Sequence, residues 1–82
     1  MSSFDFTVKD PEGIHARPAG IIVNAAKGLA GEIKITKGEK TIDAKKLFAL
    51  MGLGVKSGET ITVSSEDEGS LAEFKKVLEE NL

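Results

Sequence analysis

The stretch that organises this chain is Gly13-Ile14-His15-Ala16-Arg17-Pro18-Ala19. It contains the only histidine of the protein, with a glycine before it and a proline after it. Proline is tolerated in the first turn of a helix, because the N–H group that it lacks would have no partner within the helix there. We therefore predict that a helix begins directly after His15 and that His15 is its N-cap residue.

The residues on either side predict a strand before this stretch and a helix through it. Phe4-Asp5-Phe6-Thr7-Val8 alternates apolar and polar residues, as a half-buried strand does. Asp10-Pro11-Glu12-Gly13 has the composition of a turn. Four apolar residues then share one face of a helix that ends at Gly28, namely Ala19, Ile22, Val23 and Ala26.

The rest of the chain continues with short elements. Residues 32–36 and 40–43 alternate around a tight turn and predict a hairpin. Residues 47–54 predict a short helix closed by glycines, and residues 60–64 predict another strand. Ser70-Leu71-Ala72-Glu73 has the capping-box pattern of a helix start. The order β-α-β-β-α-β-α, with one apolar face per strand, predicts a two-layer α+β sandwich with helices on one side of the sheet.

Composition excludes several classes of function. The 82 residues are enough for one domain, and the formal net charge of −2 gives no electrostatic footprint for nucleic acid. The chain has no Cys and a single His, so we expect no disulfide, no thiolate chemistry and no metal site. We expect neither a signal peptide nor a membrane span, since no apolar run approaches about 20 residues.

A histidine at the mouth of a helix lies beside unpaired N–H donors and a partial positive charge, which attract phosphate or carboxylate. A neutral imidazole is a nucleophile, and the guanidinium of Arg17 can bind phosphoryl oxygens. Phosphoryl transfer depends mainly on positioning and charge stabilisation. His15 could therefore accept a phosphoryl group, hold it covalently and pass it on. Chemistry alone leaves open that His15 is a solvent-exposed cap and Arg17 a surface cation.

The segment from Leu47 to Leu53 is unusually apolar. On a helical wheel, Leu50 and Leu53 lie on one side, and a second group of three lies on the other, namely Leu47, Phe48 and Met51. A short helix on a one-faced sheet cannot bury both sides. The second group is either core or an exposed apolar patch of the kind that binds partners.

Residues 13–19 closely resemble the active-site signature of the HPr family, the histidine-containing phosphocarriers of the bacterial sugar phosphotransferase system. The resemblance covers essentially the whole chain, because its length, its element order, residues 43–48 and Leu53-Gly54 fall where that family has theirs. It implies one HPr-type domain over residues 1–82, with a four-stranded antiparallel sheet in the order 1-4-2-3 and three helices on one face. It implies a phosphoryl carrier rather than an enzyme, with no cofactor.

The resemblance also implies roles and partners. Enzyme I would phosphorylate His15 on Nδ1 with a phosphoryl group from phosphoenolpyruvate, and His15 would pass it to the enzyme IIA components of sugar permeases. Arg17 would stabilise the group in transfer. The chain would act in the cytoplasm as a monomer. Both partners would dock on the first two helices, at the family contact positions Ala16, Lys27, Leu47, Phe48 and Met51.

Three positions depart from the family pattern. Lys46 stands where many low-GC Gram-positive members carry a serine phosphorylated by a regulatory kinase, so we expect that regulation to be absent. We also expect Asp43 to take over capping and to lengthen the second helix at its start. Glu12 stands where small polar residues are common, and its carboxylate either tunes transfer by repelling the phosphoryl group or points away. Gly20 replaces a commonly larger residue and leaves room for a partner.

Two other functions remain as alternatives. A divergent regulatory relative would use the phosphorylation state of His15 as a signal to a protein outside sugar transport. A non-catalytic interaction domain would bind a peptide or an anion at the helix mouth without forming phosphohistidine. Whether an enzyme IIA protein accepts the phosphoryl group, and whether covalent label appears at all, separates these alternatives from the carrier.

Overall fold

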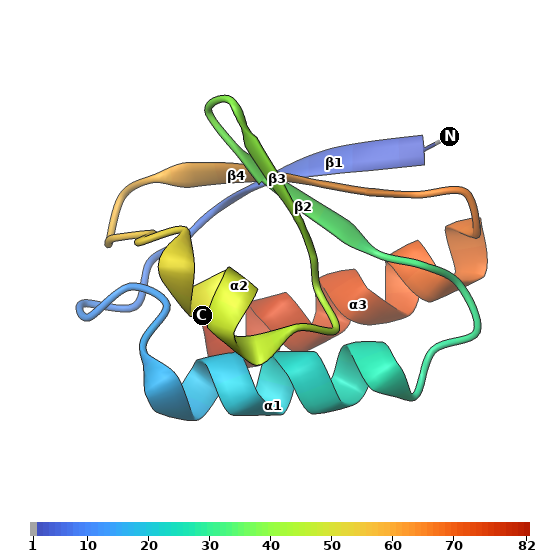
Figure 1. Cartoon of the computed structure of the whole chain (residues 1–82), viewed down its shortest axis with the longest axis horizontal. Helices are drawn as coiled ribbons and strands as arrows, with labels where there is room; N and C mark the ends of the chain where they lie inside the picture. Colours follow the sequence, from blue (N-terminus) through green and yellow to red (C-terminus); the bar gives the residue numbers. More distant parts are fainter. Residues whose placement is uncertain (1) are drawn as a thin grey trace.

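One antiparallel sheet of four strands lies over three helices, all on the same face of the sheet (Figure 1). The computed structural model describes residues 2–82. In chain order the elements are β1 (Ser2–Thr7), α1 (Ala16–Lys27), β2 (Lys34–Lys37), β3 (Lys40–Asp43), α2 (Leu47–Gly52), β4 (Thr60–Ser65) and α3 (Glu68–Asn81). The strand order is β1-β4-β2-β3. The predicted fold class, element order and sheet order are confirmed.

The inner strand β4 joins the N-terminal strand β1 to the β2–β3 hairpin. It pairs antiparallel with β1 on one side, where Phe4 lies opposite Val63, and with β2 on the other, where Ile35 lies opposite Val63. Ile35 and Val63 are fully buried. The far face of the sheet is polar and carries a hydrogen bond between the hydroxyls of Thr7 and Thr60 at 2.9 Å. This pattern explains why helices cover only one face.

Two strands are displaced from their predicted bounds. The first was expected at residues 4–8, but Val8 lies beyond β1, where its N–H donates to the Glu59 carbonyl at 3.0 Å and its carbonyl accepts from Gly58 at 2.7 Å. The second was expected at residues 32–36, but Ile33 precedes β2 and its carbonyl accepts from Ala44 at 2.9 Å. Both residues are buried. The alternation of apolar and polar residues therefore predicted correctly which residues are buried, but not which residues pair with a neighbouring strand.

The helix predicted from Leu47 does begin there, but the capping expected of Asp43 is wrong. Asp43 does not lengthen the helix, because Lys46 is the N-cap residue and makes no side-chain capping bond. Asp43 Oδ1 instead accepts the N–H of Lys45 at 2.9 Å, a turn-forming bond between residues two apart. Asp43 therefore shapes the loop before the helix.

The start of α3 was also predicted incorrectly. Asp67, not Ser70, is the N-cap residue, and its Oδ1 accepts the N–H groups of Gly69 at 3.0 Å and Ser70 at 3.2 Å. The Ser70 hydroxyl lies inside the first turn, donates to Asp67 Oδ2 at 3.1 Å and accepts the N–H of Gly31 at 3.0 Å. The serine of the predicted capping box therefore ties α3 to the loop after α1.

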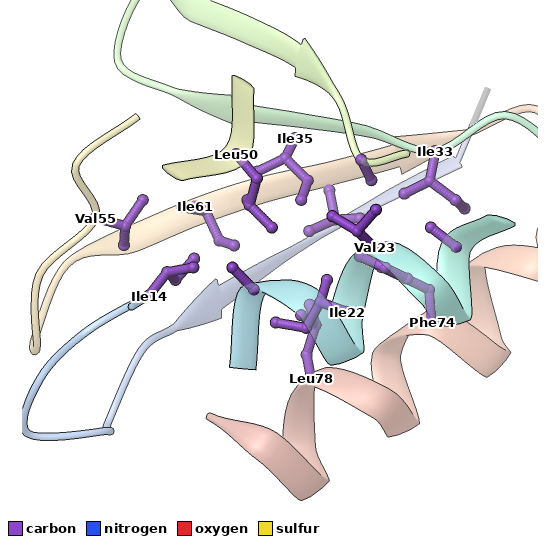
Figure 2. Packing of buried hydrophobic residues seen from close by; sticks show 14 of the residues in the cluster. Ile14, Ile22, Val23, Ile33, Ile35, Leu50, Val55, Ile61, Phe74 and Leu78 are labelled. Carbon is purple, nitrogen blue, oxygen red and sulfur yellow. The ribbon is translucent and has the colours of Figure 1, made fainter. Parts of the chain in front are cut away.

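The core lies between the sheet and the helices. Figure 2 shows side chains from α1, α2, α3 and the strands meeting in one cluster, with Ile14 and Val55 at one end of it. The largest fully buried side chains are Phe74, Ile22, Ile33, Ile35, Leu50, Ile61, Leu78, Val8 and Val63. None of the helices within residues 2–82 is long and apolar enough to cross a membrane.

Candidate functional site

The loop between β1 and α1 is built by Asp10. Its Oδ1 accepts the N–H of Glu12 at 2.9 Å, and its main-chain carbonyl accepts the N–H of Gly13 at 2.9 Å. These two bonds turn the chain tightly just before His15. The loop therefore reaches α1 in a defined conformation.

Gly13 and Ile14 dock this loop on the segment after α2. Gly13 has φ of +69°, and a Cβ there would overlap the Val55 carbonyl and lie 2.8 Å from Lys56 Cα. The N–H of Ile14 donates to the Val55 carbonyl at 3.0 Å, and its side chain enters the core. Only glycine meets both demands at position 13. Gly13 thus lets the loop lie directly against the backbone of Val55 and Lys56.

The segment that receives the loop is itself fixed by an ion pair. Lys37 Nζ lies 3.0 Å from Glu59 Oε1 and donates to the Leu53 carbonyl at 3.3 Å and the Gly54 carbonyl at 3.1 Å. Glu59 also accepts the N–H of Lys56. That backbone bond, with Lys37 second, holds the pKa of the Glu59 carboxyl below its ordinary value. The end of α2 and the His15 loop are thus linked.

His15 is the N-cap residue of α1, as predicted, but its side chain caps nothing. Among residues 2–82, no group accepts a hydrogen bond from the N–H of Ala16 or Arg17. Pro18 has no N–H, and the first intrahelical bond runs from Ala19 to the His15 carbonyl at 3.0 Å. The first turn contains no acidic residue. The N-terminus of α1 therefore presents two free donors and the positive end of the helix dipole beside an imidazole.

Two carboxylates lie beside the imidazole. His15 Nε2 is 3.6 Å from Asp10 Oδ2 and 3.7 Å from Glu12 Oε2. Glu12 therefore does not point away, which answers the question that the sequence left open. The sequence pattern predicts Asp10 only as a turn residue. The signal that points to its place in the site is that this turn leads directly into His15.

The same three side chains have the geometry to hold a cation. One ligand atom from each of Asp10, Glu12 and His15 lies within 4.8 Å of the others, and carboxylates with an imidazole suit a divalent cation. A cation bound there would occupy the imidazole nitrogen that faces the carboxylates. The expectation that the chain has no metal site stays a prediction.

A shallow hollow of about 300 Å³ opens beside His15. Its lining includes Arg17 and Ile21 from α1 and Glu80 and Asn81 from the end of α3. Nothing in the sequence indicates that the end of α3 would reach this site. A larger hollow of about 370 Å³ near the start of α3 contains neither histidine nor arginine, so the smaller one is the better candidate.

The predicted contact residues of α2 differ in how far they are exposed. The side chain of Phe48 is 86% exposed and that of Met51 is 38% exposed, whereas Leu47 is half-buried against the core. Leu50 and Leu53 are buried, so the predicted division of α2 holds with Leu47 at its boundary. Because α1 packs against α2, Phe48 and Met51 lie exposed on the helix next to the one whose N-cap residue is His15.

The contact residues of α1 lie at its two ends. Ala16 is exposed in the first turn, whereas Lys27 is exposed in the last, roughly 16 Å farther along the axis. Ile21, at 44% exposure, was not among the predicted contact residues. Ile21 lies outside the apolar stripe of α1, and that position is the sequence signal for an exposed apolar side chain.

Known proteins resemble this chain over nearly its full length. A family described as "PTS HPr component phosphorylation site" matches residues 2–80. The phosphocarrier protein HPr of Mycoplasma genitalium is 35% identical over 85 residues, which cover 99% of this chain and 97% of that protein. A crystal structure of HPr-C-His from Thermoanaerobacter tengcongensis has a TM-score of 0.90 at 28% identity, covering 99% of this chain and 94% of that one.

A much larger protein also contains a matching stretch. The multiphosphoryl transfer protein of Xanthomonas campestris is 35% identical over 74 residues, which cover 90% of this chain. The aligned stretch spans only 9% of that protein's length. The same kind of domain therefore occurs both as a small protein and as a small part of a large one.

Proposed function

The chain belongs to the HPr family of phosphocarriers of the phosphotransferase system, and from that premise we propose that His15 carries the phosphoryl group as a covalent phosphohistidine. The observation that carries this proposal is the open N-terminus of α1, where His15 makes no capping bond and the N–H groups of Ala16 and Arg17 have no partner in the described chain. A phosphoryl group on His15 would find donors and positive charge already in place.

Arg17 is the residue that we propose stabilises the transferring group. Its side chain is exposed, lines the same hollow as His15, and makes no ion pair with any residue of the described range 2–82. A guanidinium that is not held in an ion pair can turn its planar fork toward phosphoryl oxygens. This geometry supports charge stabilisation during transfer rather than a structural role.

We propose enzyme I as the donor and enzyme IIA proteins as the acceptors. The exposed apolar side chains of Phe48 and Met51, with Ala16 and the partly exposed Leu47, would contact both proteins in turn, and Lys27 would meet only a partner that extends along α1. This small apolar surface has a basic edge, formed by Lys45 and Lys46 directly before α2 and by Lys27, and it suits brief encounters with acidic partners. The chain would act as a monomeric, single HPr-type domain in the cytoplasm.

The test is transfer of labelled phosphoryl from phosphoenolpyruvate through enzyme I. We expect one acid-labile, base-stable label on the wild-type protein, none on His15→Ala, and onward transfer to an enzyme IIA protein. Arg17→Ala should lower the transfer rate while leaving the unfolding midpoint unchanged, because this side chain is exposed.

Three results would count against the proposal. Absence of label would favour a domain that only binds anions or peptides. Label that no enzyme IIA protein accepts would favour a regulatory relative. An unchanged rate in Arg17→Ala would remove the role given to that residue.

A further inference from the structure

Both carboxylates of the site approach the same nitrogen of His15. Asp10 Oδ2 and Glu12 Oε2 lie 3.6 Å and 3.7 Å from Nε2. The side chain of His15 makes no capping bond to α1, so Nδ1 is not engaged by the first turn. The two ring nitrogens therefore have different surroundings, one facing anionic acceptors and one not.

Asp10 is the less exposed of the two carboxylates. Its side chain is 25% exposed, against 75% for Glu12. One carboxylate oxygen is already committed to the N–H of Glu12 at 2.9 Å, which leaves the other directed at His15. The bond that turns the loop thus also aims the carboxylate.

We infer that Asp10, assisted by Glu12, is a positioning residue that keeps the imidazole hydrogen on Nε2 and the lone pair on Nδ1. A carboxylate can only accept a hydrogen bond, so the neutral ring next to it favours the tautomer with N–H on that side. A carboxylate that holds a catalytic histidine in one tautomer acts in the same way in Ser-His-Asp triads. The inference rests on the proposed function for its purpose, but the tautomer is a property of the free protein.

The step that this arrangement serves balances without a proton acceptor. The Nδ1 lone pair forms the bond to phosphorus, the bond from phosphorus to the donor atom breaks, and the donor atom keeps that electron pair. No proton leaves Nδ1, and Nε2 keeps its hydrogen. The phosphorylated ring becomes cationic, and the two carboxylates beside Nε2 stabilise that charge.

The same carboxylates repel the phosphoryl group from across the ring. Arg17, which lines the same hollow as His15, and the free N–H groups at the start of α1 oppose this repulsion with positive charge. Because attraction and repulsion act on the phosphoryl group together, it is bound without being trapped and remains transferable, as a carrier requires.

The test uses Asp10→Asn. The amide oxygen can still accept the N–H of Glu12, so the turn is kept and the NH2 group takes the place of Oδ2 beside Nε2. An NH2 group donates, so it favours a lone pair on Nε2 and reverses the preference. We expect the ratio of the Nε2–H to the Nδ1–H tautomer, read from imidazole 15N shifts in alkaline buffer, to fall about two- to fivefold, and further in Asp10→Asn with Glu12→Gln.

The control is Asp5→Asn, which also exchanges an exposed carboxylate that accepts one hydrogen bond, here from the Thr62 hydroxyl on the sheet. It should leave the tautomer ratio unchanged. A dominant Nδ1–H tautomer in the wild type, or equal ratios in wild type and the double variant, would overturn the inference. These spectra need no phosphorylation, so they separate a failure of this inference from a failure of the carrier function. Where label does form, Asp10→Asn should also slow transfer from enzyme I.

Discussion

The two long helices of this protein begin in opposite ways. At α3, Asp67 closes the N-terminus by accepting from Gly69 and Ser70, and the Ser70 hydroxyl is tied to both Asp67 and Gly31. At α1, His15 occupies the equivalent N-cap position and accepts nothing. Figure 1 shows the two starts at opposite ends of the helical layer, with the end of α3 near the start of α1.

This difference matches the separate roles that we propose for the two helix starts. A closed N-terminus has used its donors, and it stabilises the fold by about 0.5–2 kcal/mol relative to an uncapped helix. An open N-terminus forgoes that stabilisation and keeps its donors for a ligand. At α1 the loop is held by the Gly13–Ile14 docking on Val55 and Lys56 instead of by a cap.

The largest expected effect comes from breaking that docking. Gly13→Ala combines a positive φ with overlap against the Val55 carbonyl, so we expect the free energy of unfolding in urea to fall by about 2–4 kcal/mol. Gly38→Ala is the matched control, since Gly38 has φ of +60° but no atom within 4 Å of the added Cβ. It should cost only about 1–2 kcal/mol. Equal losses would show that docking contributes nothing.

The next effect comes from opening α3. Asp67→Ala removes the acceptor of Gly69 and Ser70, and we expect the free energy of unfolding to fall by about 1–2 kcal/mol while the transfer rate stays at the wild-type value. Glu66→Ala changes the exposed neighbour and should alter neither the free energy of unfolding nor the transfer rate. A slowed transfer rate in Asp67→Ala would mean that the two helix starts are not independent.

Closing α1 should have a smaller effect on stability and remove the function. His15→Asp supplies a carboxylate at the N-cap, where it can accept from the first turn, so we expect a gain of about 0.5–1 kcal/mol in unfolding free energy and complete loss of label. His15→Ala, which also loses the label but offers no acceptor, is the comparison. If His15→Asp were no more stable than His15→Ala, the free donors would not be available to an anion.

The smallest expected effect is a dependence of the free energy of unfolding on pH. Because the pKa of Glu59 is lowered in the folded state, its stabilisation is complete above the ordinary carboxyl pKa and is lost as the pH falls through the lowered value. We therefore expect Glu59→Gln to be less stable than wild type at neutral pH and the difference to vanish in acid. Urea unfolding at several pH values measures it, and a constant difference would contradict the role of the Glu59 charge.

Local patterns predicted most of this fold. Pro18 and Gly28 marked the ends of α1 because proline and glycine act through their own backbone, and alternation marked which strand residues are buried. The start of α3 could not be chosen from sequence, because Asp67 and Ser70 both suit an N-cap and the choice depends on Gly31, far along the chain. Asp10 and Glu80 join the site only through the folded loop and the packing of α3 beside α1.

The most direct test compares the amide groups at the two helix starts before and after phosphorylation. In 1H–15N NMR spectra, we predict large downfield shifts for the Ala16 and Arg17 N–H groups when His15 carries the phosphoryl group, because they gain an anionic acceptor. The Gly69 and Ser70 N–H groups, already bound to Asp67, should not move. Label on His15 with unmoved Ala16 and Arg17 signals would contradict the claim that the open start of α1 holds the phosphoryl group.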